Sequence, residues 1–186
     1  KWNISRSEQD EFAAHSQEKY VAAEAKNRFH EERIKVEIPS KKEIITFDKD
    51  EQPRASGVEA LSKLKPAFVA DGTVTAGNSS GINDGAACLI LCNEATVKKY
   101  NLQPIAKIKS MAIAGVEPRY MGIGPVVATR KALHRAGLQV SDLDLIELNE
   151  AFASQSIACI RDLALDTSKV NVNGGSIAIG HPLGAS

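Results

Sequence analysis

Small and apolar side chains recur at helical spacing in several stretches of the chain. In the first stretch, from about residue 6 to residue 27, they return every three or four positions: Phe12, Ala13, Ser16, Tyr20 and Ala23. Ser5 precedes this stretch, and Glu8 follows Ser5 by three residues, which is the pattern of a capping box. Similar spacing or helix-end signals predict further helices over residues 58–64, 94–100, 126–136 and 149–163.

Other stretches have the pattern of β-strands. Residues 34–38 alternate and stop at Pro39, and residues 44–47 are placed to pair with them. Further apolar runs predict four more strands, at residues 86–92, 105–113, 145–148 and 170–172. We expect those at 86–92 and 145–148 to be buried. Because strands and helices alternate from about residue 86 onward, we expect an α/β fold.

Charge divides the chain into two regions. Of the first 65 residues 26 are charged, against 20 of the remaining 121, which predicts a solvated layer followed by a packed core. The 23 basic and 23 acidic side chains cancel, so no overall basic field attracts nucleic acid or an anionic membrane. The longest apolar run, residues 86–92, is too short to span a bilayer.

Two polar segments follow predicted strands, at the place where ligands bind in open α/β sheets. Asn149 comes directly after residues 145–148 and fits either a helix cap or a functional amide. His181 stands between Gly180 and Pro182, which restricts its backbone. A fixed imidazole suits a general base or the activation of a thiol, and a merely structural histidine is the alternative.

The cysteines, by contrast, predict no reactive site. Cys88, Cys92 and Cys159 fall on apolar strand or helix positions, so we assign all three to interior packing. Their spacing resembles no zinc site, and we expect no metal. An odd number of cysteines without a visible signal peptide indicates a reducing compartment. We therefore expect the cytoplasm, and the unseen native N-terminus leaves an organelle open.

Four motifs occur here in the order in which thiolases carry them: residues 76–81 (AGNSSG), 121–125 (MGIGP), 149–152 (NEAF) and 174–182 (GGSIAIGHP). The chain therefore resembles the thiolase family, and within it the acetyl-CoA acetyltransferases and 3-ketoacyl-CoA thiolases. The resemblance spans essentially the whole chain. The combination of Asn-Glu-Ala-Phe with Gly-His-Pro is far more specific than either motif alone.

The resemblance implies an incomplete thiolase-like α/β architecture. Residues 1–75 match the later part of the family's loop domain, and residues 76–102 match the end of its N-terminal half. Residues 103–186 match the beginning of the C-terminal half, which is truncated. The chain also starts without Met and stops in a glycine-rich segment, so we expect an internal fragment of a longer protein.

The resemblance also implies a reaction: Claisen condensation of acetyl-CoA, or thiolytic cleavage of 3-ketoacyl-CoA, through a cysteine acyl-enzyme. Coenzyme A thioesters are then substrates, with no separate cofactor. His181 matches the histidine that activates the nucleophilic cysteine, and Asn149 matches the asparagine that holds a water in an oxyanion hole. Further matched positions contact coenzyme A or line its acyl channel: Ser80, Arg54, Leu61, Phe68, Ala76 and Phe152. Family members form dimers or tetramers, so we expect a homodimer or homotetramer.

Neither catalytic cysteine motif of the family is present in this sequence, so we expect the chain alone to be inactive. Two other interpretations are a ketoacyl synthase-type condensing enzyme and a non-catalytic acyl-CoA or lipid-binding thiolase relative. Both usually carry histidine in place of the amide at Asn149, which disfavours them. The acyl chain length and a biosynthetic or degradative role stay open.

Overall fold

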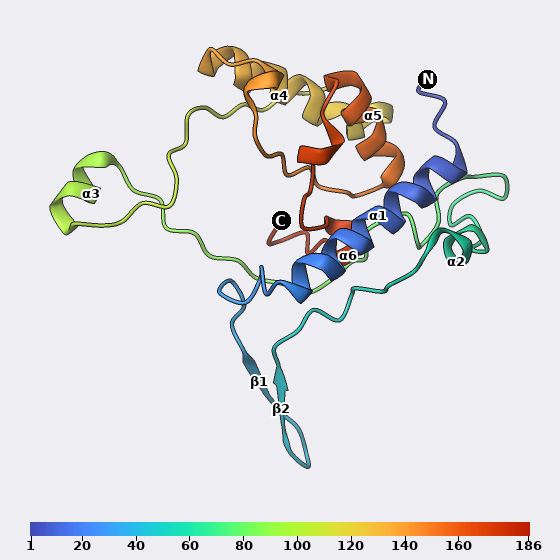
Figure 1. The fold of residues 1–186 in the computed structure, drawn as a ribbon, viewed down its shortest axis with the longest axis horizontal. Helices are drawn as coiled ribbons and strands as arrows, with labels where there is room; N and C mark the ends of the chain where they lie inside the picture. The colour runs from blue at the N-terminus through green and yellow to red at the C-terminus, as the bar shows by residue number, and fades with distance from the viewer.

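The structure is a computed structural model that describes all 186 residues. Helix α1 (Arg6–Ala25) lies across its centre (Figure 1). It packs against α2 (Val58–Ser62), α5 (Ala153–Leu163) and α6 (Ser176–Ile179). The predicted capping box is confirmed: the Glu8 amide donates to the Ser5 hydroxyl at 3.2 Å, and the Ser5 amide donates to the Glu8 carboxylate at 2.8 Å.

The predicted hairpin is also confirmed. Strands β1 (Val36–Pro39) and β2 (Ile44–Phe47) pair antiparallel, with Val36 opposite Phe47, and project from the body beyond the end of α1 (Figure 1). The remaining elements are two α-helices and three short 3₁₀ turns: α3 (Glu94–Tyr100), α4 (Gly124–Ala136), η1 (Pro118–Ile123), η2 (Val140–Asp142) and η3 (Thr167–Lys169).

The apolar core consists of two small clusters. One joins α4 and α5 to the segment after them, through Val126, Cys159, Ile160, Leu163, Leu165 and Val170. The other lies under α1 and contains Ala13, Ala14, Leu61, Ala153 and Ile177. Phe12 packs against both clusters. The charge-rich first third is therefore more than a solvated layer, because its longest helix supplies core residues.

Two strand predictions are wrong in this structure. Residues 86–92 and 105–113 run extended, form no strand and make no backbone hydrogen bond to another segment. They lead to and from α3, away from the body (Figure 1), and Leu89 and Ile105 are 86% and 103% exposed. A strand needs a neighbouring backbone for its N–H and C=O groups, and no other segment of the chain supplies one. The Met111 and Ile113 carbonyls accept from the Arg135 and Lys131 side chains of α4 instead.

Three further expectations need correction. The strand predicted over 145–148 is reduced to one parallel bridge, between Ile146 and Val170. Asn149 does not cap α5, which begins four residues later with Phe152 at the N-cap position. Of the cysteines only Cys159 is buried, because Cys88 and Cys92 lie on the extended segment.

None of the helices has the length and apolar character that a bilayer crossing requires.

Burial raises the pKa of the Cys159 thiol, which donates to the Gly122 carbonyl at 3.3 Å. The thiol of Cys159 therefore stays protonated at neutral pH. Its assignment to packing is confirmed.

Gly174 allows α1 to lie close to the loop below it. Its φ is +86°, and a Cβ there would come within 2.8 Å of the Ser16 carbonyl oxygen. Gly137 has a similar φ of +68° but open space around it.

We expect Gly137→Ala to lower the free energy of unfolding by about 1 kcal/mol from the backbone conformation alone. Gly174→Ala is expected to cost roughly 1–3 kcal/mol more, because α1 must move. Urea unfolding of both variants tests this, and equal losses would contradict it.

Candidate active site

Three motif segments that are far apart in the sequence meet beside α1. The Ser80 amide donates to the Ala151 carbonyl at 3.1 Å, and the Ala153 amide donates to the Asn78 carbonyl at 2.9 Å. On the other side of the same loop, the His181 amide donates to the Gly81 carbonyl at 3.1 Å. The loop at 78–81 is thus held between the segments that carry Asn149 and His181.

The side chains of Asn149 and His181 face each other within this arrangement. The Asn149 Nδ2 lies 3.3 Å from the His181 Nε2. The Ser176 hydroxyl donates to the Asn149 Oδ1 at 2.7 Å, which directs the amide nitrogen toward the imidazole. An unprotonated Nε2 can accept from this amide or take a proton from a third group. When Nε2 is protonated, both nitrogens are donors, and together they can stabilise an oxyanion.

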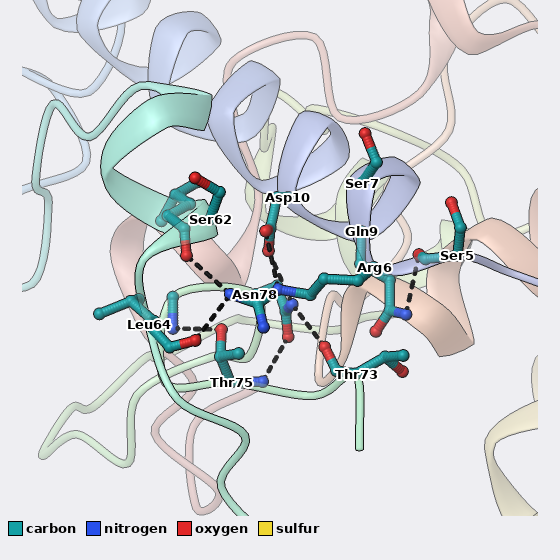
Figure 2. A network of polar contacts seen from close by, with 12 residues as sticks. Ser5, Arg6, Ser7, Gln9, Asp10, Ser62, Leu64, Thr73, Thr75 and Asn78 are labelled. Atoms are coloured by element: carbon teal, nitrogen blue, oxygen red, sulfur yellow. Dashed lines mark hydrogen bonds and ion pairs between the residues drawn. The ribbon is translucent and has the colours of Figure 1, made fainter. Parts of the chain in front are cut away.

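A second polar network fixes the loop to α1 (Figure 2). Asn78 is fully buried; its Oδ1 accepts from the Thr75 amide at 2.8 Å, and its Nδ2 donates to the Thr73 carbonyl at 3.0 Å. The same Nδ2 donates to the Asp10 carboxylate at 2.9 Å, whose other oxygen pairs with Arg6 at 2.7 Å. Every polar group of the Asn78 side chain is therefore used to shape the loop that carries Ser80.

The other predicted site residues lie in three different environments. Phe68 is 74% exposed, and its ring meets the ring of Phe152 edge to face at 6.2 Å between centroids. Leu61 is 4% exposed and belongs to the core cluster under α1. Ala76 is exposed at the start of the loop, and the exposed Arg54 is tied by its backbone amide to Gln17 at 2.9 Å.

Hydrogen bonds or ring contacts therefore connect Ser80, Phe68 and Phe152 with the segments of Asn149 and His181. No hydrogen bond or ion pair connects the Arg54 guanidinium with them. The roles assigned to these residues stay predictions. No group of three or more His, Cys, Asp or Glu side chains is arranged to hold a metal ion.

Sequence reasoning missed four polar residues that support the site: Ser16, Glu150, Asn171 and Ser176. Glu150 is 2% exposed although it directly follows Asn149. A carboxylate next to a candidate amide is a weak signal of burial. The hydroxyl that contacts Glu150 belongs to Ser16, 134 residues earlier, and no spacing rule connects the two.

Two family models together match nearly the whole chain. The model "Thiolase, N-terminal domain" matches residues 1–95, and the model "Thiolase, C-terminal domain" matches residues 102–186. The chain belongs to the thiolase family. The domain limits expected from the motifs, 1–75, 76–102 and 103–186, stay predictions.

Relatives and solved structures agree with this membership. The chain is 56% identical to an acetyl-CoA acetyltransferase of Pseudomonas aeruginosa and 53% identical to one of Escherichia coli, over all of its own length. It spans 48% and 47% of those proteins. The crystal structure of the Bacillus anthracis acetyl-CoA acetyltransferase matches 99% of the chain with a TM-score of 0.96 and 45% identity. Human mitochondrial 3-ketoacyl-CoA thiolase matches 98% with a TM-score of 0.90 and 47% identity.

These matches confirm the thiolase-like fold of the chain. The chain spans about half the length of the curated relatives it matches, and 47% and 46% of the two solved chains. The candidate site draws residues from both family matches: Ser80 lies within the N-terminal match, and Asn149 and His181 lie within the C-terminal match.

Substitutions at Asn78 test the loop network. Asn78→Ala leaves the Thr75 amide and one oxygen of the Asp10 carboxylate without a partner. Asn78→Asp sets a carboxylate oxygen against Asp10 and the Thr73 carbonyl. We expect each to lower the free energy of unfolding by ~2–4 kcal/mol. Gln103→Glu, the same chemical change at an exposed residue, is expected to have little effect. A tolerated Asn78→Asp in urea unfolding would show that the network is dispensable.

A pH-dependent effect is expected at Glu147. Partial desolvation raises the pKa of this carboxyl from its ordinary value of 4.5 although the residue is exposed, Glu150 raises it further, and Lys19 lowers it. The folded state thus favours the protonated form, and the stability that this provides is lost as the pH rises through the folded pKa. Glu147→Gln should therefore raise the urea midpoint at pH 7, and the gain should disappear near pH 4. Glu18→Gln, at an exposed and unpaired site, is the control; a lower midpoint for Glu147→Gln at pH 7 would refute the expectation.

Proposed function

We propose that the protein containing this chain is an acyltransferase acting on coenzyme A thioesters. It would catalyse reversible Claisen condensation of acetyl-CoA or thiolytic cleavage of 3-ketoacyl-CoA through a cysteine acyl-enzyme. The observation that carries the proposal is the 3.3 Å approach of the Asn149 amide to the His181 imidazole. Membership of the thiolase family and relatives named acetyl-CoA acetyltransferase support it.

In the proposed reaction His181 acts as the base. Its Nε2 takes the proton of a cysteine thiol, and the thiolate attacks the thioester carbonyl carbon before the coenzyme A thiolate leaves. Between the attack and the departure of the coenzyme A thiolate, the protonated imidazole and a water held by the Asn149 amide face the negative oxygen of the tetrahedral intermediate. Cys88, Cys92 and Cys159 make no hydrogen bond to either residue, so the reacting thiols are proposed to come from outside this chain.

The substrate-binding residues form part of the same proposal. Ser80 is held beside Phe152 by its bonds to Ala151, at 3.1 Å from its amide and 3.3 Å from its hydroxyl. We assign Ser80 to the pantetheine arm of coenzyme A and the Phe68–Phe152 pair to the acyl channel. Ala76 and Leu61 complete this set, with Arg54 at the adenine end.

The wider setting is proposed on separate grounds. All three cysteines are free, which fits the reducing environment of the cytoplasm. A homodimer or homotetramer follows from the family, and coenzyme A thioesters serve as substrates without a further cofactor.

Thiolysis of acetoacetyl-CoA by the full-length protein tests the function. We expect His181→Ala to lower kcat by roughly 10²–10⁴-fold and Asn149→Ala by about 10²–10³-fold. His134→Ala, on the exposed part of α4, is the matched control and should keep wild-type activity. The 186-residue chain alone should show no turnover.

The result that overturns the proposal is a full-length protein that binds acyl-CoA without turning it over. That outcome would favour a non-catalytic binding relative. Full activity of His181→Ala would also refute the role of His181 as base.

A further inference from the structure

A buried carboxylate lies directly behind the pair of candidate catalytic side chains. Glu150 accepts three hydrogen bonds: from the Ser16 hydroxyl at 2.7 Å, the Ile177 amide at 3.1 Å and the Asn171 Nδ2 at 2.8 Å. The Ser16 donor comes from α1, whereas Asn171 and Ile177 belong to the segment that leads into α6 and to its first turn. A side chain at Gly175 would overlap the Glu150 carboxyl group, so the loop passes directly against it. The proposed reaction uses none of these contacts.

All three donors have fixed directions. The Ile177 donor is a backbone N–H and cannot reverse. The Ser16 Oγ receives the Gly175 amide at 3.0 Å, which turns its hydroxyl proton toward Glu150. The Asn171 amide cannot flip, because its Oδ1 accepts from the Leu148 amide at 2.7 Å and its Nδ2 donates to the Leu148 carbonyl at 2.8 Å. The site therefore requires a group with acceptor oxygens on both sides.

This carboxylate connects the two segments that place the candidate catalytic groups. Through its own backbone, Glu150 is joined to Asn149, and its amide donates to the Ser176 hydroxyl at 2.7 Å. Through Ile177, it holds the start of α6, which leads in four residues to His181. The distance between the Asn149 amide and the His181 imidazole thus depends on contacts that converge on Glu150.

We propose that Glu150 is a positioning residue that sets the separation of Asn149 and His181 in the reaction. The inference rests on the proposed function. Glu150→Gln tests it, since glutamine has the same volume but one acceptor oxygen fewer. Its Nε2 must point at Asn171 or at the Ser16 and Ile177 donors, and either choice sets donor against donor in a buried site.

The experiment compares Glu150→Gln with Glu147→Gln in the full-length protein. The control makes the same glutamate-to-glutamine change three residues away, and the Glu147 side chain makes no hydrogen bond to the network. We expect Glu150→Gln to lower kcat for acetoacetyl-CoA thiolysis about 10–100-fold, with KM changed by less than about threefold. Glu147→Gln should keep kcat within roughly twofold of wild type. A loss of kcat without a loss of substrate affinity separates positioning from general unfolding.

A crystal structure of each variant gives a second measurement that does not depend on activity. The Asn149 Nδ2 to His181 Nε2 distance should increase beyond 3.3 Å in Glu150→Gln and stay unchanged in Glu147→Gln. If Glu150→Gln does not fold, Ser16→Ala decides, because it removes one donor and keeps the carboxylate; its kcat should fall several-fold. A wild-type kcat in folded Glu150→Gln, or in Ser16→Ala where Glu150→Gln does not fold, overturns the inference. An inactive wild type refutes the proposed function instead. The Asn149 to His181 distance in each of the two variants then still tests whether Glu150 positions these residues.

Discussion

The structure depends on polar contacts between helix α1 and the two loops that carry the site. Asp10 holds the loop of Asn78, and Ser16 holds the turn at Gly175 and the carboxylate of Glu150. These groups are buried, and a buried polar group is costly unless its hydrogen bonds are made. Helix α1 can therefore make all these hydrogen bonds in only one position along its axis. A purely apolar face would fix this position less strictly, because apolar contacts have no direction.

This dependence crosses the boundary between the two thiolase domains. Helix α1 and the loop at 78–81 lie in the N-terminal match, whereas Asn149, Glu150 and His181 lie in the C-terminal match. Hydrogen bonds such as that from Ser80 to Ala151 and that from His181 to Gly81 join the two regions. Movement of one domain against the other would therefore separate the loop from the candidate catalytic pair.

Elements defined by neighbouring residues could be predicted from the sequence. The capping box of α1 and the hairpin of β1 and β2 follow from contacts within a few residues, and both occur as expected. The end of α4 at Gly137, with φ of +68°, has the same local origin. The strands at 86–92 and 105–113 failed because the pattern shows only that a segment suits a sheet. Pairing needs a second segment, which the pattern cannot supply.

The candidate site shows the same division. The motifs placed Asn149 and His181 in the site through family resemblance, and the structure brings them together. Spacing alone left both a helix cap and a functional amide open for Asn149. The segment from 149 to 152 bonds to Ser176 and Ser80, and α5 starts later, so Asn149 is not the cap. Contacts such as Ser16 with Glu150 are set by packing between distant segments, so no local rule reveals them.

Asn171 shows how a side chain can take the place of a peptide group. The parallel ladder between Ile146 and Val170 ends at once, because the backbone of Asn171 turns into the left-handed region with φ of +45°. The side-chain amide of Asn171 then offers Leu148 the same oxygen and N–H that the next rung of a sheet would provide. Asparagine carries a copy of the backbone amide and tolerates this conformation, so the main chain can leave the ladder one residue early. An aspartate here would lack the N–H of that imitation and a leucine would lack both groups, and the segment leading to Asn149 would lose its hydrogen bonds at Leu148.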